Sequence, residues 1–296
     1  MEYTLKNKKL TVVFESKGAT LHSIKDNDGV EYLWEGNPEY WSGQAPVLFP
    51  ICGSIRDDKA QIGDGKQTNM PRHGVVRKKE FKCVERTENS ILFEIESNKE
   101  MLAQYPYEFK LGINYILEGK KITIRYIIEN KDKEIMPFQI GGHPGFHCPL
   151  YKEESYEDYE LVFEQKETCT VPTPEGPVTE TGLIDMEHRS KFLKDTDTLP
   201  LKHDLFSVDA VILDQLKSRA VTLKSKKHNK GIRVDFNQFP YLILWSTAKE
   251  ADFVALEPWI GLSTCSDEGD KFEEKRNIQY AQAGEVKEYE FHINIL

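Results

Sequence analysis

Long apolar runs and targeting signals are missing from this sequence. No stretch approaches the ~18 consecutive apolar residues that a membrane-spanning helix needs. The first ten residues, MEYTLKNKKL, contain neither the apolar segment nor the small-residue cleavage site of a secretory signal. We therefore expect a cytoplasmic protein with no membrane partner.

Cysteine is scarce, and basic residues are outnumbered by acidic ones. The five cysteines are odd in number, widely spaced and without a CxxC pair, which argues against a disulfide framework and against a zinc finger. The 39 Lys and Arg against 49 Asp and Glu give a net charge of −10, a sign that repels phosphate backbones. The sequence thus predicts reduced thiols and no nucleic-acid partner.

Several signatures of cofactor and nucleophile chemistry are also absent. The chain has no GxxxxGK[ST] and no GxGxxG after a strand, so neither ATP nor NAD is indicated. It has no GxSxG elbow, and Cys265 has no adjacent histidine. His143 and His147 have helical ligand spacing, but Pro144 and Gly145 between them exclude that helix. We expect neither a cofactor nor a metal.

What the sequence does contain is a period-two pattern in short runs rich in Val, Ile, Thr, Tyr and Phe, which is typical of strands. The clearest runs are residues 9–16, 89–97, 109–119, 120–130, 159–165, 231–236, 241–247 and 286–296. Turn residues at 27–29, 118–120 and 229–231 indicate antiparallel hairpins. Only 98–105 and part of 267–281 favour a turn or two of helix.

The length of 296 residues fits one or two domains. Strand-like runs recur throughout with no Ser/Gly linker, and the Pro-rich loop 171–181 is the nearest thing to a boundary. We interpret residues 1–296 as a single all-β domain, one large antiparallel β-sandwich. The sequence leaves monomer and homodimer open.

Glu257 is the most informative ionisable residue. It ends the apolar run FVAL and precedes Pro258 and Trp259. A carboxylate in such a context is at least partly buried, and burial raises its pKa, so that it can serve as a base. The alternative is a carboxylate that only closes a strand by bonding to backbone.

His143 lies in GGHPGF, where Gly and Pro exclude regular structure. A histidine and a glutamate in one pocket form an acid and base couple near neutral pH, although an isolated histidine can equally be structural. Trp259, Trp245 and Phe146 offer flat apolar faces for a sugar ring, or else belong to the core.

Three further polar residues stand in apolar, Gly- or Pro-marked contexts. Arg56 follows an apolar strand and a glycine, His73 lies in PRHG, and Asp209 leads into AVIL. Arg56 and Asp209 could hydrogen-bond the hydroxyls of a sugar whose ring packs on the aromatic faces.

The ordered series of an Arg after a Gly, then PRHG, GGHP with a following aromatic, FxxDAVIL and EPWxG resembles the aldose 1-epimerase (galactose mutarotase) family, and most closely its LacX-like branch. The resemblance spans residues 56 to 261 and implies a galactose mutarotase-like supersandwich. That branch is associated with lactose and galactose metabolism.

The same resemblance implies roles for individual residues. Glu257 would take the proton from the O1 hydroxyl of the sugar while His143 gives one to the ring oxygen, so that the ring opens and recloses as the other anomer. His73, Arg56 and Asp209 would bind or orient the pyranose. The implied substrate is an aldohexose such as galactose or glucose, and no cofactor is required.

Some positions depart from the family pattern. Ile55, Val75, Val76 and Gly145 replace residues usual in the better-studied relatives, and we expect them to alter the pocket wall. A basic cluster of Arg72, Arg77, Lys78 and Lys79 could reach a hexose 6-phosphate, or could be a solvated strand end.

Two other functions remain open at this level. The first is a non-catalytic carbohydrate-binding protein that keeps the pocket. The second is a glycoside hydrolase that uses Glu257 and Asp209 as its carboxylate pair, which would need the two groups ~5 to 9.5 Å apart.

Overall fold

Buried and exposed residues alternate along most of the strands. In the computed structural model, which describes residues 1–174 and 183–296, strand β2 (Leu10–Glu15) buries every second residue. The ten-residue strands β9 (Phe109–Glu118) and β10 (Lys121–Asn130) follow the same rule over much of their length. This is the pattern of strands that pack one face against a core.

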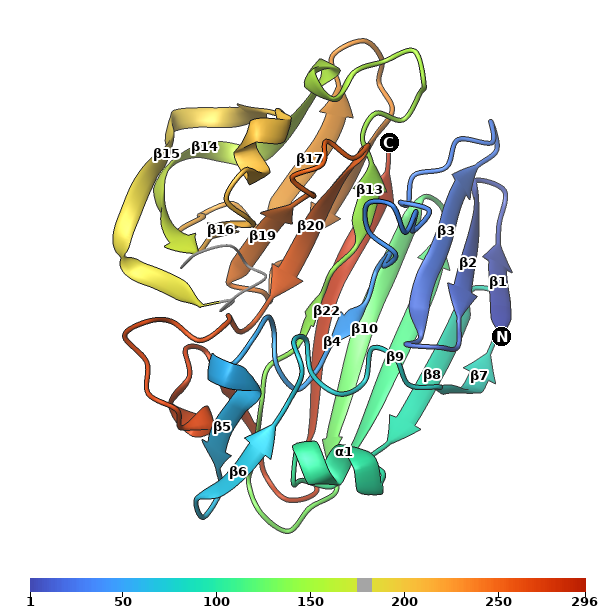
Figure 1. Cartoon of the computed structure of the whole chain (residues 1–296). Coiled ribbons are helices and arrows are strands. Elements are labelled where there is room, and N and C mark those ends of the chain that lie inside the picture. Colours follow the sequence, from blue (N-terminus) through green and yellow to red (C-terminus); the bar gives the residue numbers. More distant parts are fainter. Residues whose placement is uncertain (175–182) are drawn as a thin grey trace.

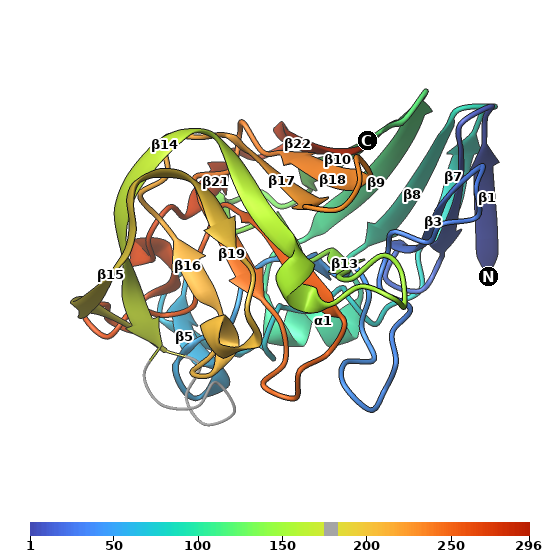
Figure 2. The ribbon, with the colours of Figure 1, turned by 90° about the horizontal axis from the view of Figure 1, so that it is seen from above.

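The largest sheet has nine strands in antiparallel order, and its neighbouring strands β9 and β10 are joined by a tight turn at Gly119. From one edge to the other the order is β15 (Ile184–Pro200), β14 (Tyr159–Pro174), β17 (Ala220–Ser225), β18 (Gly231–Asp235), β22 (Val286–Ile295), β10, β9, β8 (Ser90–Glu96) and β7 (Lys82–Arg86). Strands β14 and β15 curve away from the rest of the sheet (Figures 1 and 2). The expected hairpin at 118–120 is therefore confirmed.

A second sheet carries the candidate site. Its strands are β16 (Val211–Leu213), β19 (Tyr241–Trp245), β20 (Phe253–Trp259), β12 (Gly141–Gly142) and β4 (Val47–Leu48), with β13 (Gly145–His147) also paired to β20. Strand β20 is buried along its whole length, because it has neighbours on both sides and is covered on both faces.

The remaining elements are short. They are the sheet β1 (Glu2–Lys6), β2 and β3 (Thr20–Asp26), the pairs β5 (Lys59–Ile62) with β6 (Lys66–Asn69) and β11 (Met136–Phe138) with β21 (Gln279–Ala281), helix α1 (Lys99–Gln104), and the 3₁₀ turns η1 (Arg56–Asp58), η2 (Tyr156–Asp158), η3 (His203–Phe206) and η4 (Phe272–Glu274). Helix α1 begins after Asn98, whose side chain accepts a hydrogen bond from the Met101 N–H.

The two helix predictions had different outcomes. The prediction for 98–105 is confirmed by α1, whereas 267–281 forms only η4 and β21. The loop expected at 171–181 is shorter than predicted at its start, because Val171–Pro174 continue β14 in its pairing with β15, and residues 175–182 lie outside the described residues.

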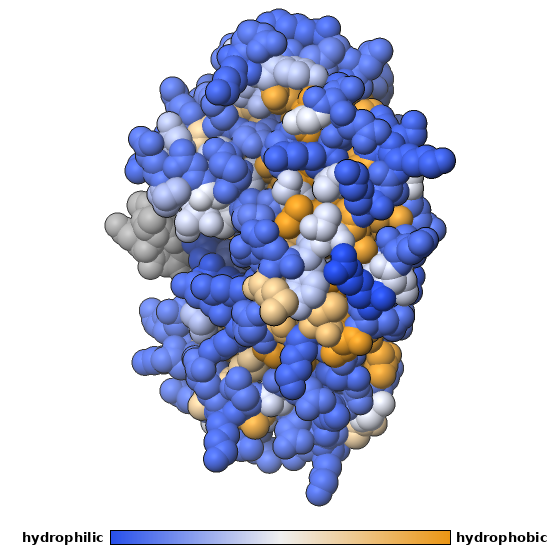
Figure 3. Space-filling view, turned by 90° about the vertical axis from the view of Figure 1, so that its right-hand side faces the viewer, coloured by the Kyte–Doolittle hydropathy of each residue, from blue (hydrophilic) through white to orange (hydrophobic). Residues whose placement is uncertain are grey.

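The core lies between the two large sheets. One hydrophobic cluster joins Ile113 and Ile124 of the nine-stranded sheet to Leu242, Val254 and Leu256 of the second sheet. The predicted all-β sandwich is thus confirmed. Seen from the side of β1 and β7, the surface is mostly hydrophilic with small apolar patches (Figure 3). Among the described residues, no helix has the length and apolar character to cross a membrane.

Candidate functional site

Strand β20 places Glu257 on the face of the second sheet that points away from the main core. Val254 and Leu256 belong to the main core cluster, so the alternation of a strand directs Glu257 and Trp259 to the opposite face. The neighbouring strand β19 places Ile243 directly across from Glu257. Glu257 is only 1% exposed, so the expected burial of this carboxylate is confirmed.

His143 lies opposite Glu257 on the other side of β20. Gly141 pairs with Trp259 and Gly145 pairs with Ala255, which leaves His143 in register with Glu257 between two short strands. The imidazole Nε2 is 3.4 Å from Oε2 of the carboxylate. This separation is small enough for both groups to act on adjacent oxygens of one sugar.

His73 enters the same site from a strained turn. Its φ of 67° is in the left-handed region, and Gly74 follows with a φ of 79°. A Cβ at Gly74 would lie 2.1 Å from the Phe49 carbonyl oxygen, so only glycine fits there. The His73 ring lies edge-on to His143 and to Trp259, with centroids 5.5 and 5.7 Å away.

These residues line a cavity of about 240 Å³, enough for a single sugar ring. Its lining consists of Trp41, Pro46, Arg72, His73, Arg77, His143, Ala210, Ile243, Trp245, Glu257 and Trp259. Three buried polar atoms in this lining have no hydrogen-bond partner among the described residues, namely Nδ1 of His143, Oε2 of Glu257 and Nε1 of Trp259. Unpartnered buried polar atoms are costly, so their convergence here indicates a ligand site.

Burial shifts both members of the His143 and Glu257 pair toward their neutral forms. It raises the pKa of Glu257 well above its ordinary value, and nearby Asp209 raises it further. Arg72 opposes this shift, as does the Trp259 indole N–H, which approaches the carboxylate without forming a well-aligned hydrogen bond. Burial lowers the pKa of His143 to about 3, with Arg72 and Arg77 adding to the effect.

Two arginines bring positive charge to the pocket. Arg72 and Arg77 both line it, and burial together with the charge of Arg72 lowers the pKa of Arg77. Among the described residues, the Arg77 guanidinium forms no ion pair. Lys78 and Lys79 line a separate cavity next to Arg77, where Lys79 pairs with Glu100 at 2.6 Å. The basic cluster noted in the sequence is therefore divided between two sites.

Asp209 stands beside the cavity. Its neighbour Ala210 lines the pocket, and burial raises the pKa of the Asp209 carboxyl while Arg72, the Ala210 N–H and the approaching Trp245 indole lower it. The structure thus brings together Glu257, His143, His73 and Trp259, with Asp209 at their edge.

Arg56 and Phe146, two of the predicted substrate-binding residues, lie elsewhere. The Arg56 guanidinium donates to Asp270 at 3.1 Å and to the Glu268 carbonyl at 2.9 Å, outside the pocket. Phe146 is fully buried in the main core, because it pairs with Val254 and shares the core-facing side of the sheet. Neither side chain therefore reaches the cavity, and the prediction that they bind the sugar is corrected: Arg56 holds a surface segment and Phe146 packs in the core.

The residues that depart from the family pattern differ in their effect on the pocket wall. Ile55, Val75 and Val76 are buried in the main core rather than in the lining of the cavity. Gly145 does affect the wall, because a Cβ there would lie 2.8 Å from Cζ3 of Trp41.

Trp41 is not among the residues predicted from the sequence, and Arg72 and Arg77 were predicted only as part of a basic cluster. A signal for Arg72 was present, since it directly precedes His73 in PRHG. Trp41 carried no such signal, because it lies in a connecting segment more than a hundred residues from His143 in the sequence.

Other polar sites are less suited to chemistry. A larger cavity of about 490 Å³ lies near Trp34 and Tyr40, but its histidine, His147, already faces Glu35 at 3.2 Å. A third, of about 270 Å³, is lined by half-buried ion-paired residues such as Arg125 and Glu290.

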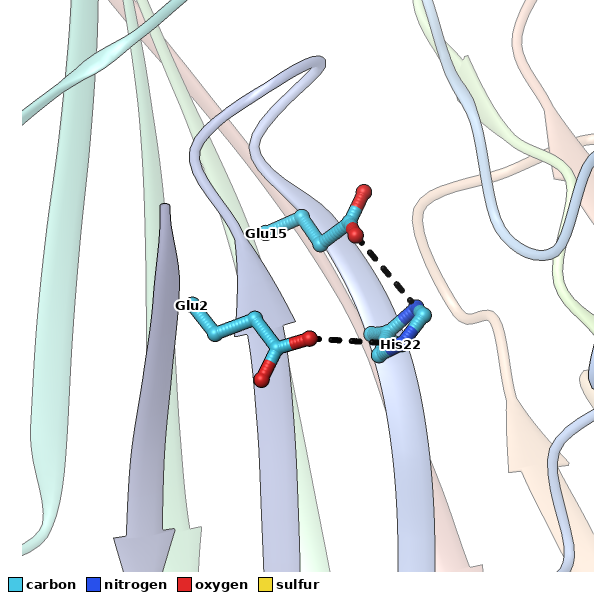
Figure 4. A group of neighbouring side chains, drawn as sticks. All are labelled: Glu2, Glu15 and His22. Carbon is cyan, nitrogen blue, oxygen red and sulfur yellow. Dashed lines mark ion pairs between the residues drawn. The ribbon is translucent and has the colours of Figure 1, made fainter.

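Glu2, Glu15 and His22 point toward one another from β1, β2 and β3 (Figure 4). Both carboxylates stand 3.8 Å from His22, whose Nδ1 bonds to Gln44. The imidazole of His22 is thus already engaged through Nδ1, and Glu2 is exposed.

Comparison with known proteins identifies the family of the chain. Residues 1–278 match the family model described as aldose 1-epimerase. The chain belongs to the aldose 1-epimerase family. It is 48% identical to the plasmid-encoded protein LacX of Lactococcus lactis subsp. lactis over the full length of both chains.

Solved structures of related aldose 1-epimerase-like proteins share the fold. A galactose mutarotase related enzyme from Lactobacillus acidophilus is 30% identical, with a TM-score of 0.93 over 100% of this chain and 97% of the other. A galactose mutarotase-like protein from Lactobacillus casei ATCC 334 is also 30% identical, with a TM-score of 0.88 over the whole of both chains. As a member of the aldose 1-epimerase family, the chain is an isomerase of the mutarotase class.

Proposed function

We propose that this aldose 1-epimerase interconverts the α and β anomers of an aldohexose such as galactose or glucose, with Glu257 and His143 as base and acid. The observation that carries the proposal is the 3.4 Å approach of His143 Nε2 to Glu257 Oε2 in a cavity whose unpartnered polar atoms include both residues. Trp259 and Trp245 provide apolar walls for the sugar ring.

Ring opening needs one proton to leave the sugar and another to enter it. The Glu257 carboxylate takes the proton of the O1 hydroxyl as C1 and O1 become a carbonyl group. The bond between C1 and the ring oxygen breaks, and the His143 imidazolium gives its proton to that oxygen. Rotation about the bond from C1 to C2 and reversal of both transfers closes the other anomer.

The electrostatics of the pocket favour this direction of proton flow. In the sugar complex before opening, the pair is a carboxylate and an imidazolium, a state that burial disfavours in the empty pocket and that we propose forms when the sugar binds. After opening, it is a neutral acid and a neutral imidazole. Burial raises the pKa of Glu257 and lowers that of His143, so it stabilises the neutral pair that accompanies the open-chain sugar. The site thereby lowers the energy of the open-chain state relative to the closed ring.

The proposal extends to hexose 6-phosphates. Arg77 is a partly buried guanidinium without an ion-pair partner among the described residues, and Arg72 lines the same cavity. Guanidinium groups bind phosphate through charge-assisted, often bidentate hydrogen bonds. The net charge of −10 does not oppose this, because the local charge of the pocket differs from that of the whole chain.

Polarimetry of freshly dissolved α-anomers, over a panel of hexoses and hexose 6-phosphates, tests the proposal. We expect the wild-type protein to accelerate mutarotation of at least one sugar over buffer, and Glu257→Gln to abolish the acceleration. Rates equal to buffer for the whole panel would refute it. Calorimetric binding of a sugar by both proteins without acceleration would instead identify a non-catalytic carbohydrate-binding protein.

We further propose that residues 1–296 form one domain that works in the cytoplasm without a nucleic-acid partner, as monomer or homodimer. The family match over 1–278 and the main core, which joins both large sheets, support the single domain. The five thiols are free, which suits a reducing compartment.

A further inference from the structure

Trp41 forms an aromatic contact with the imidazole of His143. The two rings are stacked, with centroids 4.8 Å apart and an interplanar angle of 28°. Trp41 lies between β3 and β4, so it reaches the pocket from a part of the chain distant from the GGHP segment. Trp245 lies edge to face with both rings, with centroids 5.3 Å from Trp41 and 5.4 Å from His143.

Two glycines create the space that Trp41 occupies. A Cβ at Gly145 would lie 2.8 Å from Cζ3 of the indole, and a Cβ at Gly43 would lie 2.6 Å from Cε2. Any larger residue at either position would displace the ring. The Trp34 indole N–H also donates to the Trp41 carbonyl at 2.8 Å, which fixes the backbone beneath the stacked ring.

His143 lacks the contact that usually orients a reactive histidine. An imidazole is normally held by a hydrogen bond from the ring nitrogen that does not react. Here Nδ1 has no hydrogen-bond partner among the described residues, and Nε2 faces Glu257. The ring contacts therefore set the plane of this imidazole together with the approach of Nε2 to Glu257 and a contact of the side chain with its own backbone.

We propose that Trp41 is a positioning residue that holds the His143 imidazole in its reactive orientation by stacking, in the space left by Gly145. This inference rests on the proposed role of His143 in proton transfer. It also gives Trp41 a second effect, since the indole covers one face of the imidazole and keeps water from it.

The test compares Trp41→Ala, Trp41→Phe and Gly145→Ala with the wild-type protein. Tyr40→Ala is the matched control, because it truncates the adjacent aromatic, which contacts Trp34 and does not line this pocket. Two quantities are measured: kcat and KM for the best sugar of the panel, and the titration of the His143 imidazole by NMR without sugar. Groups that also influence this titration are Glu257, His73, Arg72 and Arg77, and all are unchanged in the four variants.

We expect Trp41→Ala to lower kcat roughly 10- to 100-fold with a smaller change in KM, because misplaced reacting groups lose rate more than binding. Its His143 pKa should rise toward 6.5 as water reaches the ring. Gly145→Ala should reproduce both effects by displacing the indole, Trp41→Phe should restore most of the rate, and Tyr40→Ala should change neither quantity.

The inference would be overturned if Trp41→Ala and Tyr40→Ala lowered kcat equally. It would also be overturned if the His143 titration were unchanged in both Trp41→Ala and Gly145→Ala. The titration is independent of turnover. If no sugar is epimerised by the wild-type protein, the proposed function fails, whereas the titration still decides whether Trp41 covers and positions His143. Thermal melting of each variant separates these effects from unfolding.

Discussion

The backbone N–H of Gly53 donates a hydrogen bond to Nδ1 of His73 across 3.1 Å. Because Nδ1 is the acceptor, a neutral His73 must carry its proton on Nε2, at the opposite edge of the ring. Burial lowers the pKa of His73 well below its ordinary value, so the ring stays neutral. His73 is thus a fixed hydrogen-bond donor for the pocket.

Replacing that donor should weaken sugar binding. We expect His73→Leu to raise the dissociation constant of the sugar roughly 10-fold, the effect of about one lost hydrogen bond to a buried partner. His73→Gln, which keeps a side-chain N–H, should lose less. Calorimetry with the preferred sugar provides the measurement, and equal affinity of both variants and the wild-type protein would contradict the assigned donor.

Removal of the acid or the base should reduce the rate far more than binding. Glu257→Gln and His143→Asn are each expected to slow mutarotation by roughly 10²–10⁴-fold, the usual contribution of a proton-transferring side chain. The double variant should lose little beyond the worse single variant, since the two groups act as a unit. Additive losses measured by polarimetry would argue against a shared proton pathway.

Protein stability should depend on pH through the same pair, with opposite signs. The pKa of Glu257 is raised in the folded state, so its contribution to stability is present below the unfolded pKa of about 4.5 and is lost as pH rises. The folded-state pKa of His143 is about 3 against 6.5 unfolded, so stability is lost as pH falls between these values.

Urea unfolding from pH 4 to pH 8 separates the contributions of Glu257 and His143 to the free energy of unfolding. Each unit by which a group's pKa differs between the folded and unfolded states contributes about 1.4 kcal/mol. Glu257→Gln should lessen the loss of stability on the alkaline side, and His143→Asn should lessen it on the acid side. His73 leaves part of the acid-side loss in place, because its pKa is lowered as well. Parallel curves for wild-type and variant proteins would show that neither group is shifted.

Arg77, which lines the pocket, and Arg56, which lies outside it, provide a matched test of phosphate binding. Arg77→Ala should raise KM for a hexose 6-phosphate at least 10-fold more than for the unphosphorylated hexose, because the charge faces the pocket. Arg56→Ala should leave both KM values unchanged and cost at most ~1 kcal/mol, since its partner Asp270 is exposed. A similar effect of both substitutions on either sugar would remove phosphate binding from the proposal.

Strands and hairpins could be predicted from the sequence because their signals are local. The alternation in Phe109–Glu118 and Lys121–Asn130 and the turn at Gly119 predict a hairpin without knowledge of the rest of the chain. The short helix at Lys99–Gln104 was accessible for the same reason. The segment 267–281 has helical composition but forms only the 3₁₀ turn η4 and the short strand β21, which pairs with Met136–Phe138 from a distant part of the chain.

Positions within the site depended on nonlocal information. Glu257 could be recognised because a carboxylate at the end of an apolar strand is unusual. Arg56 and Arg72 are both polar residues near glycines, and only the fold shows that the first pairs with Asp270 while the second lines the cavity. Phe146 differs from His143 by the side of the sheet it faces, which depends on register with β20.

Strand β20 also determines the order in which the two sides of the site would unfold. Its seven residues are all buried and it is paired on both sides, so its amide hydrogens should exchange with deuterium only when the sheet as a whole opens. Trp41, in contrast, lies on a half-exposed connecting segment held by a few hydrogen bonds. Gentle warming should therefore release the Trp41 side of the pocket first, while the backbone that carries Glu257 remains in place until the end.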